Sequence, residues 1–366
     1  MTRCAIGVLA WMVAMMAGCN APPAGGGSTT QNATGGTAAN RNANSTANNN
    51  RNINANTSGN VNQNVNAPAA TGGRITYRLP SGELFRIEAR DGATPENLTA
   101  ALDRLASGND NWLNTSANGE WLVLDTERFD PDCAGFACLA VVTGALASPE
   151  SVRADGQVIH PDGFGAITSA GDAIVFPSAG GPHNLDLWIT RRSGGAWSAP
   201  QLLSGASPYA FNAQPSISND GRLVVFDCGP VQYAGEGTAI CQVGMDNTGF
   251  RVVLTPANAP PGLSERGALH SPSVAPDGSI VFEGDWDGER VWRLPAGASV
   301  PVRVGTDFPN DNSPCVLPDG RVVSLWLDRP GGPGVHEIKV MTADASNFFV
   351  LQTGVDVADT GIGCGE

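Results

Sequence analysis

The chain has 366 residues, a formal net charge of −14 and only 15% charged residues. This acidic balance argues against binding to DNA or RNA backbones, which requires clustered Lys and Arg. Lys339 is the only lysine, so a P-loop, which needs a lysine after its glycines, is excluded. All 35 acidic residues but only 17 of the 21 basic residues follow Arg74, so that part carries a net charge of −18.

The first residues predict a secretion signal. A short basic start, Met1–Arg3, precedes an apolar run, Ala5–Ala17, that is too short for a membrane span. The run ends in Met16-Ala17-Gly18-Cys19, which resembles a bacterial lipoprotein lipobox. The resemblance implies a signal peptide over residues 1–18, lipid on Cys19 and, because Asn20 is not Asp, sorting to the outer membrane. The alternative is an ordinary signal peptide with an incidental cysteine.

Residues 19–73 predict a disordered tether. After Cys19 this segment is rich in Asn, Ala, Gly and Thr and contains no acidic residue. Such a composition cannot bury enough apolar surface to offset the entropy of ordering. We therefore expect a membrane-tethered folded domain over residues 74–366.

The folded part repeats one phrase. The copies combine a short strand, a Gly-containing turn that is Asp-Gly or Asn-Gly in four of the five, and a β-branched strand, and they begin 42 to 57 residues apart. A third and often a fourth strand follow each copy. This period predicts the four-stranded blades of a β-propeller. The five copies are Trp112–Leu124, Gly165–Phe176, Gln214–Phe226, Ser271–Phe282 and Ser313–Val323.

The copies at Pro272–Phe282 and Pro314–Met341 carry the family resemblance. The phrase Ser-Pro-x-x-x-Pro-Asp-Gly-x-x-Val-x-Phe resembles the WD40-like repeat of TolB-type propellers, which implies an all-β, six-bladed fold with protein contacts in the cell envelope. Only five phrases are visible. We expect strands at Ile75–Leu79 and Phe85–Ala89 to join a C-terminal strand near Cys364 and to close the ring. A helix is expected at Pro95–Ala106.

Six cysteines remain after the signal peptide and Cys19, an even number that fits an oxidising compartment. The blade assignment places two of them on adjacent strands of one blade and two on the inner strands of the last two blades. Zinc is the alternative, but His residues are absent near these cysteines. The predicted disulfides are Cys133–Cys138, Cys228–Cys241 and Cys315–Cys364.

A polar residue stands just before each expected inner strand. Inner strands line the central channel, so these side chains would ring one of its mouths, and carboxylates in that arrangement suit Ca²⁺. The alternative is that they only cap turns and tie neighbouring blades together. The candidate binding residues are Asp110, Asp162, Asn212, His270, Asp311 and Asp359.

The sequence indicates a non-enzymatic envelope lipoprotein. We expect a monomer that offers its acidic channel mouth to a protein or peptide, contacts the membrane only through its lipid and binds no nucleic acid. No catalytic residue is identified and no cofactor is expected, apart from the candidate Ca²⁺. Two alternatives stay open: a metal-dependent lactonase or esterase of the propeller type, and a carbohydrate-binding surface lipoprotein, for which exposed Trp would be needed.

Overall fold

The computed structural model describes residues 72–366, except 232–234, 305–309, 328–334 and 356–361. Contacts divide the chain into two units, Met1–Gly59 and Asn60–Glu366, and every described residue belongs to the second. The predicted signal peptide, Cys19 and almost all of the tether therefore lie outside the described residues, as does Asp359. No helix in the described ranges is both long enough and apolar enough to cross a membrane.

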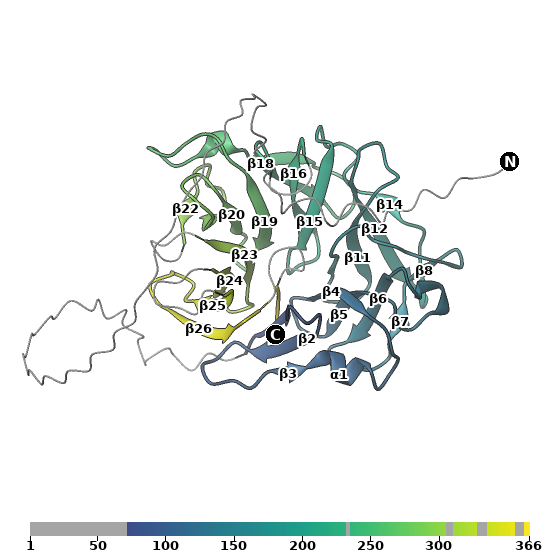
Figure 1. Cartoon of the computed structure of the whole chain (residues 1–366). Coiled ribbons are helices and arrows are strands. Elements are labelled where there is room, and N and C mark those ends of the chain that lie inside the picture. The colour runs from purple at the N-terminus through teal and green to yellow at the C-terminus, as the bar shows by residue number, and fades with distance from the viewer. Residues whose placement is uncertain (1–71, 232–234, 305–309, 328–334, 356–361) are drawn as a thin grey trace, which may run out of the picture. The chain divides into compact units, whose positions relative to one another are not determined.

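The second unit is built almost entirely of antiparallel sheets that lie around a common centre (Figure 1). Four of them are four-stranded meanders, and each meander is built from four strands that follow one another in the chain. They comprise β4 (Asp110–Thr115), β5 (Trp121–Thr126), β6 (Cys138–Thr143) and β7 (Glu150–Ser151); β15 (Phe211–Ile217), β16 (Leu223–Gly229), β17 (Ala239–Gly244) and β18 (Arg251–Leu254); β19 (Leu269–Val274), β20 (Ile280–Gly284), β21 (Arg290–Leu294) and β22 (Val302–Arg303); and β23 (Asp311–Val316), β24 (Val322–Trp326), β25 (Glu337–Met341) and β26 (Phe348–Thr353).

A fifth four-stranded sheet joins the two ends of the domain. Its order is β27-β1-β2-β3, from β1 (Arg74–Arg78), β2 (Leu84–Glu88), β3 (Glu96–Asn97) and β27 (Gly363–Gly365). Thr76 pairs with Gly363 and Arg74 with Gly365. This is the expected union of the N-terminal hairpin with a C-terminal strand.

The remaining sheet departs from the prediction. It has seven strands: β8 (Arg153–Ala154), β9 (Gln157–Val158), β10 (Ala166–Ile167), β11 (Ala173–Ser178), β12 (Asp186–Ser193), β13 (Ala196–Trp197) and β14 (Gln201–Leu202). The prediction of six four-stranded blades is therefore wrong for the described chain, in which five sheets have that form.

The cause of this departure is the length of β12. Its eight residues exceed the five or six of the other third strands. Its inner part pairs with β14, and its outer end pairs with β13 through a turn at Gly194 and Gly195, both of which have positive φ. Trp197 of β13 then pairs in parallel with Ala154 of β8. Three extra strands are thus added to the outer end of one sheet.

The helix is also shorter than expected. α1 spans Leu98–Leu102, and Asn97 caps it by accepting a hydrogen bond from the backbone N–H of Ala100. The residues just before it, Glu96 and Asn97, pair with β2 instead. Pairing along β2 therefore delays the start of the helix. Two short 3-10 helices are also present, η1 (Pro131–Cys133) and η2 (Pro256–Asn258).

Apolar side chains of adjacent sheets pack between the sheets. One cluster joins Val175 and Leu187 of one sheet to Val224 and Phe226 of the next. The repeat predicts buried aromatic side chains on the second and third strands. Phe176, Phe226 and Phe282 of second strands and Trp292 of a third strand are buried, whereas Trp188, at the position equivalent to Trp292, is only partly buried.

Candidate functional site: the channel cavity and the acidic strand ends

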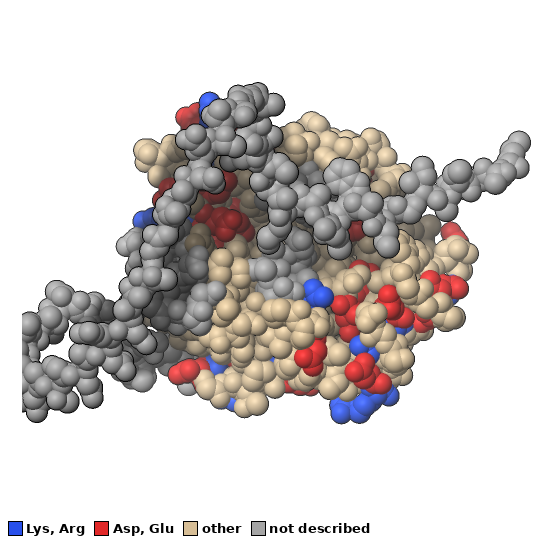
Figure 2. Space-filling model, viewed as in Figure 1, with Lys and Arg blue, Asp and Glu red and all other residues tan. Residues whose placement is uncertain are grey.

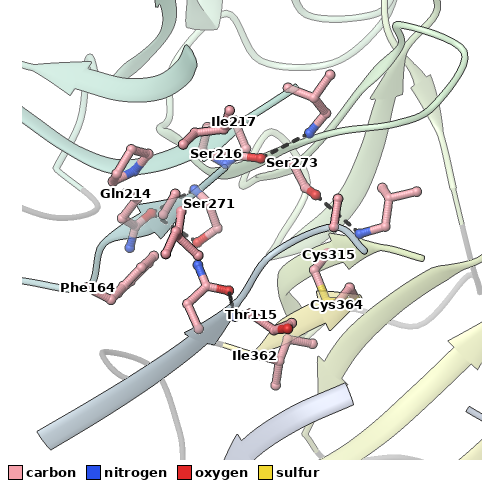
Figure 3. A pocket seen from close by; sticks show the side chains of 18 of the residues that line it. Thr115, Phe164, Gln214, Ser216, Ile217, Ser271, Ser273, Cys315, Ile362 and Cys364 are labelled. Atoms are coloured by element: carbon pink, nitrogen blue, oxygen red, sulfur yellow. Dashed lines mark hydrogen bonds between the residues drawn. A yellow bond between two sulfur atoms is a disulfide. The ribbon is translucent and has the colours of Figure 1, made fainter. Parts of the chain in front are cut away.

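A cavity of about 100 Å³ lies between the first strands. Residues of six sheets line it, and none of these lining residues is charged. Their polar groups are hydroxyls and amides, such as those of Thr115, Gln214 and Ser273 (Figure 3). In a domain of net charge −17, the channel cavity is therefore a neutral, hydrogen-bonding environment.

The repeated residue before proline shapes this lining. Gln214, Ser271 and Ser313 precede Pro215, Pro272 and Pro314, and their φ values are +49°, +47° and +46°. At each of these positions the register of the first strand shifts, as in a β-bulge. A bulge redirects the side chains that follow, so the same device recurs in three neighbouring sheets. The Xaa-Pro step of the repeat thus has a structural role in the channel wall.

Hydrogen bonds tie these first strands to one another. The Gln214 side-chain oxygen accepts hydrogen bonds from the backbone N–H and the hydroxyl of Ser271, at 2.8 and 3.0 Å. The Ser216 hydroxyl accepts one from the N–H of Val274, and the Ser273 hydroxyl accepts one from that of Val316 (Figure 3). The wall is consequently held in place before any ligand arrives.

None of the described residues predicted to ring a channel mouth lines this cavity, which is formed by later residues of the first strands. Asn212 and His270 are buried near the beginnings of β15 and β19. Asp162 lies before β10, where its carboxylate accepts hydrogen bonds from Ser178 and Ala179. Each of these residues therefore lies one to three positions ahead of the first cavity-lining residue of its segment.

Two members of the predicted ring, Asp110 and Asp311, pair with cations of their own sheets. Asp110 accepts hydrogen bonds from Arg128 Nε and Nη2 at 3.0 and 2.9 Å, and Arg128 is only 1% exposed. Asp311 is paired with the buried Lys339. Carboxylates that are already neutralised do not fit a Ca²⁺ site, and no group of three His, Cys, Asp or Glu residues suited to a metal occurs in the described ranges.

Sequence reasoning missed a second set of carboxylates, on the second strands. Asp125, Asp227 and Glu283 each directly follow a large apolar residue, Leu124, Phe226 or Phe282, and this repeat position is the feature that could have revealed them. All three are at most 8% exposed. Acidic atoms gather in the hollow near β20 and again near β6 (Figure 2).

Burial perturbs the protonation of these groups. It raises the pKa of Asp125 to about 6, of Asp227 to about 7 and of Glu283 to about 8. His270 is the cross-strand partner of Glu283, and burial lowers the pKa of its imidazole to about 4. Both members of this pair are therefore largely uncharged at neutral pH.

The three predicted disulfides are confirmed: Cys133–Cys138, Cys228–Cys241 and Cys315–Cys364. The last joins β23 to β27 across the junction of the chain ends, and both of its cysteines line the channel cavity (Figure 3). Trp286 and Trp326 are 4% and 2% exposed. Neither therefore offers the exposed ring that the carbohydrate-binding alternative needs.

Comparisons with known proteins define the class of fold. No family model and no curated protein matches the sequence. Among solved structures, a TolB-type protein from Agrobacterium tumefaciens is similar at 17% identity and a TM-score of 0.51, over 77% of this chain and 88% of that one. TolB from Acinetobacter baumannii is similar at 13% identity and a TM-score of 0.55, over 80% of this chain and 66% of that one. The described chain is thus a β-propeller with a TolB-like fold.

Proposed function

We propose that the chain is a cell-envelope lipoprotein whose TolB-like propeller is a non-enzymatic scaffold that binds a protein partner. In this proposal residues 1–18 are a signal peptide, Cys19 carries the lipid, and residues 19–73 tether a monomeric domain, residues 74–366, to the outer membrane. The lipobox-like motif supports the attachment, and the similarity of fold to TolB supports envelope protein contacts.

The proposal includes a closed ring of six blades. The seven-stranded sheet would serve as the sixth blade, because β10, β11, β12 and β14 keep the blade order. The pairing of β1 with β27, the disulfide between Cys315 and Cys364, and contacts of β27 with both β4 and β23 support closure. Closure matters because it gives the channel a continuous, rigid wall.

The channel cavity is the observation that carries the binding function. Its lining is uncharged, and several of its polar side chains are already oriented by hydrogen bonds between strands. Such a wall suits recognition of backbone amides or neutral side chains of a partner. It offers no paired acid and base and no His, so the cavity favours binding over hydrolysis.

The test is a pull-down from envelope extract with the tagged full chain, with and without a Ca²⁺ chelator. Asn219 lies at the cavity and is exposed, so Asn219→Arg would place a charge at its mouth; Gln157→Arg makes the same charge change on exposed β9. A protein retained by the wild type and by Gln157→Arg, but lost with Asn219→Arg, supports the proposal. No retained protein in either arm overturns it, and loss with chelator alone would restore the Ca²⁺ prediction.

A further inference from the structure

A second, smaller cavity lies beside Asp227, apart from the channel. Leu185, Phe211 and Thr238 contribute to its wall, and it has room for about one water-sized group. Two neighbouring sheets build it, because Leu185 forms a β-bridge with Phe211 of β15. Gly229 is the cross-strand partner of Phe211, so no side chain occupies that position. The cavity is thus a narrow, mainly apolar recess with one carboxylate in its wall.

One oxygen of the carboxylate in this recess lacks a partner, although backbone N–H groups of Asp227 and Ala213 interact with the carboxylate. Asp227 is 4% exposed, and its Oδ1 atom accepts no hydrogen bond from any described residue. No ion pair among the described residues includes it. A buried acceptor without a donor is costly, so a donor that enters the recess would be stabilised by this oxygen.

The electrostatic surroundings specify a cation. Glu283 of the next sheet is close enough to Asp227 to interact with it, and residues 74–366 carry a net charge of −17. Burial raises the pKa of Asp227 to about 7, and backbone hydrogen bonds from Asp227 and Ala213 oppose that shift only in part. Since folding has already desolvated the carboxylate, a bound cation need lose only its own hydration.

The size of the recess and the chemistry of its wall distinguish an ammonium from a guanidinium group. An ammonium group is a compact charge on a flexible apolar stem, whereas a guanidinium is a wider planar fork. The recess has room for about one water-sized group, so only an ammonium head would enter it, and Leu185 and Phe211 would contact the adjoining methylene group. This combination favours a primary ammonium on an alkyl chain over a guanidinium.

We propose that this recess binds the ε-ammonium group of a lysine side chain on a partner protein. The proposal rests on the protein-binding function proposed above and specifies the chemistry of the partner's contact. A second copy of this chain cannot supply the lysine, because its only lysine, Lys339, is fully buried. The partner is therefore a different protein that presents an exposed lysine.

To test this proposal, the full chain is titrated with Nα-acetyl-lysine amide and, in separate experiments, with Nα-acetyl-arginine amide, spermidine and CaCl₂. Binding is monitored by NMR of the protein. Asp227→Asn removes the charge without changing the shape. Asp125→Asn makes the same change at the equivalent position of β5, which lines neither cavity. Phe211→Ala removes part of the apolar wall and leaves the carboxylate in place.

We expect lysine amide to bind the wild type and Asp125→Asn equally, at least tenfold more weakly to Asp227→Asn, and several-fold more weakly to Phe211→Ala. Equal binding of the arginine probe, equal weakening by both Asp→Asn variants, or binding of only spermidine or Ca²⁺ would overturn the lysine recess. If Asp227→Asn still retains the pulled-down partner, the recess fails and the scaffold function stands. If the wild type retains none, the scaffold function fails while the lysine titration still tests the recess.

Discussion

Lys339 donates a hydrogen bond to the carboxylate of Asp311, and both side chains are buried and belong to strands of the same sheet. The Ser324 hydroxyl also donates to Asp311, at 2.9 Å, and the Lys339 ammonium lies 4.5 Å from the ring centroid of Trp326. This group joins β23, β24 and β25 at a single point. The only lysine of the chain therefore serves the interior of the propeller.

We expect Lys339→Met to destabilise the domain by about 3–5 kcal/mol, because it leaves a buried carboxylate without its cation. Chemical denaturation monitored by Trp fluorescence measures the change. The double variant Lys339→Met with Asp311→Asn removes both charges and should recover much of the lost free energy. Equal stability of the single variant and the wild type would show that the pair contributes nothing.

The disulfide between Cys315 and Cys364 should contribute more than the one between Cys133 and Cys138. The two bonds span sequence separations of 49 and 5, and the chain-entropy account gives about 4 and about 2 kcal/mol for loops of these sizes. Replacing each pair by serines and comparing denaturation midpoints measures both contributions. A larger loss for the Cys133–Cys138 pair would contradict this ranking.

The stability of the domain should fall between pH 6.5 and 8. Burial raises the pKa of Glu283 to about 8 and of Asp227 to about 7, so the folded state holds protons that the unfolded state has released. Stability from such groups is present at low pH and decreases as pH rises through the folded pKa. Burial lowers the pKa of His270 to about 4, which opposes this trend only below about pH 6.5.

Glu283→Gln tests this pH dependence, because it removes the group with the highest of these pKa values. Its denaturation midpoint should exceed that of the wild type by more at pH 8 than at pH 5. Exposed Glu265→Gln is the matched control and should leave the pH profile unchanged. A wild-type profile that is flat between pH 6.5 and 8 would contradict the prediction.

Cys19→Ala should release the protein from the membrane fraction. Two or three acyl chains hold a lipoprotein stably, and the lipobox-like motif predicts that Cys19 carries them. Fractionation of cells that express the full chain, followed by immunoblotting, measures the release. Ser28→Ala, in the adjoining tether, is the control and should stay in the membrane fraction. Retention of Cys19→Ala in that fraction would argue against lipidation.

The local repeat explains how much of the fold could be predicted. Each copy of the repeat contains, within a dozen residues, its own Gly-containing turn and β-branched second strand, and the last three copies also contain an Xaa-Pro step. These local features can therefore be predicted from each copy separately. Two of the disulfides could be predicted from the blade assignment, because it brings Cys228 close to Cys241 and Cys315 close to Cys364. The seven-stranded sheet was missed because its cause, the longer β12 and its pairing with β13 and β8, involves segments without the repeat.

For the charged residues, too, the sequence predicts some properties and the tertiary structure decides others. Sequence alone determined that the domain is acidic, that its strands form repeated antiparallel sheets and that one polar residue opens several first strands. Only the tertiary structure decided that Asp110 and Asp311 are neutralised while Asp227 is buried without a cation. Charge state and access depend on which side chains of other strands come within hydrogen-bond reach, and the order of residues along one strand does not contain that information.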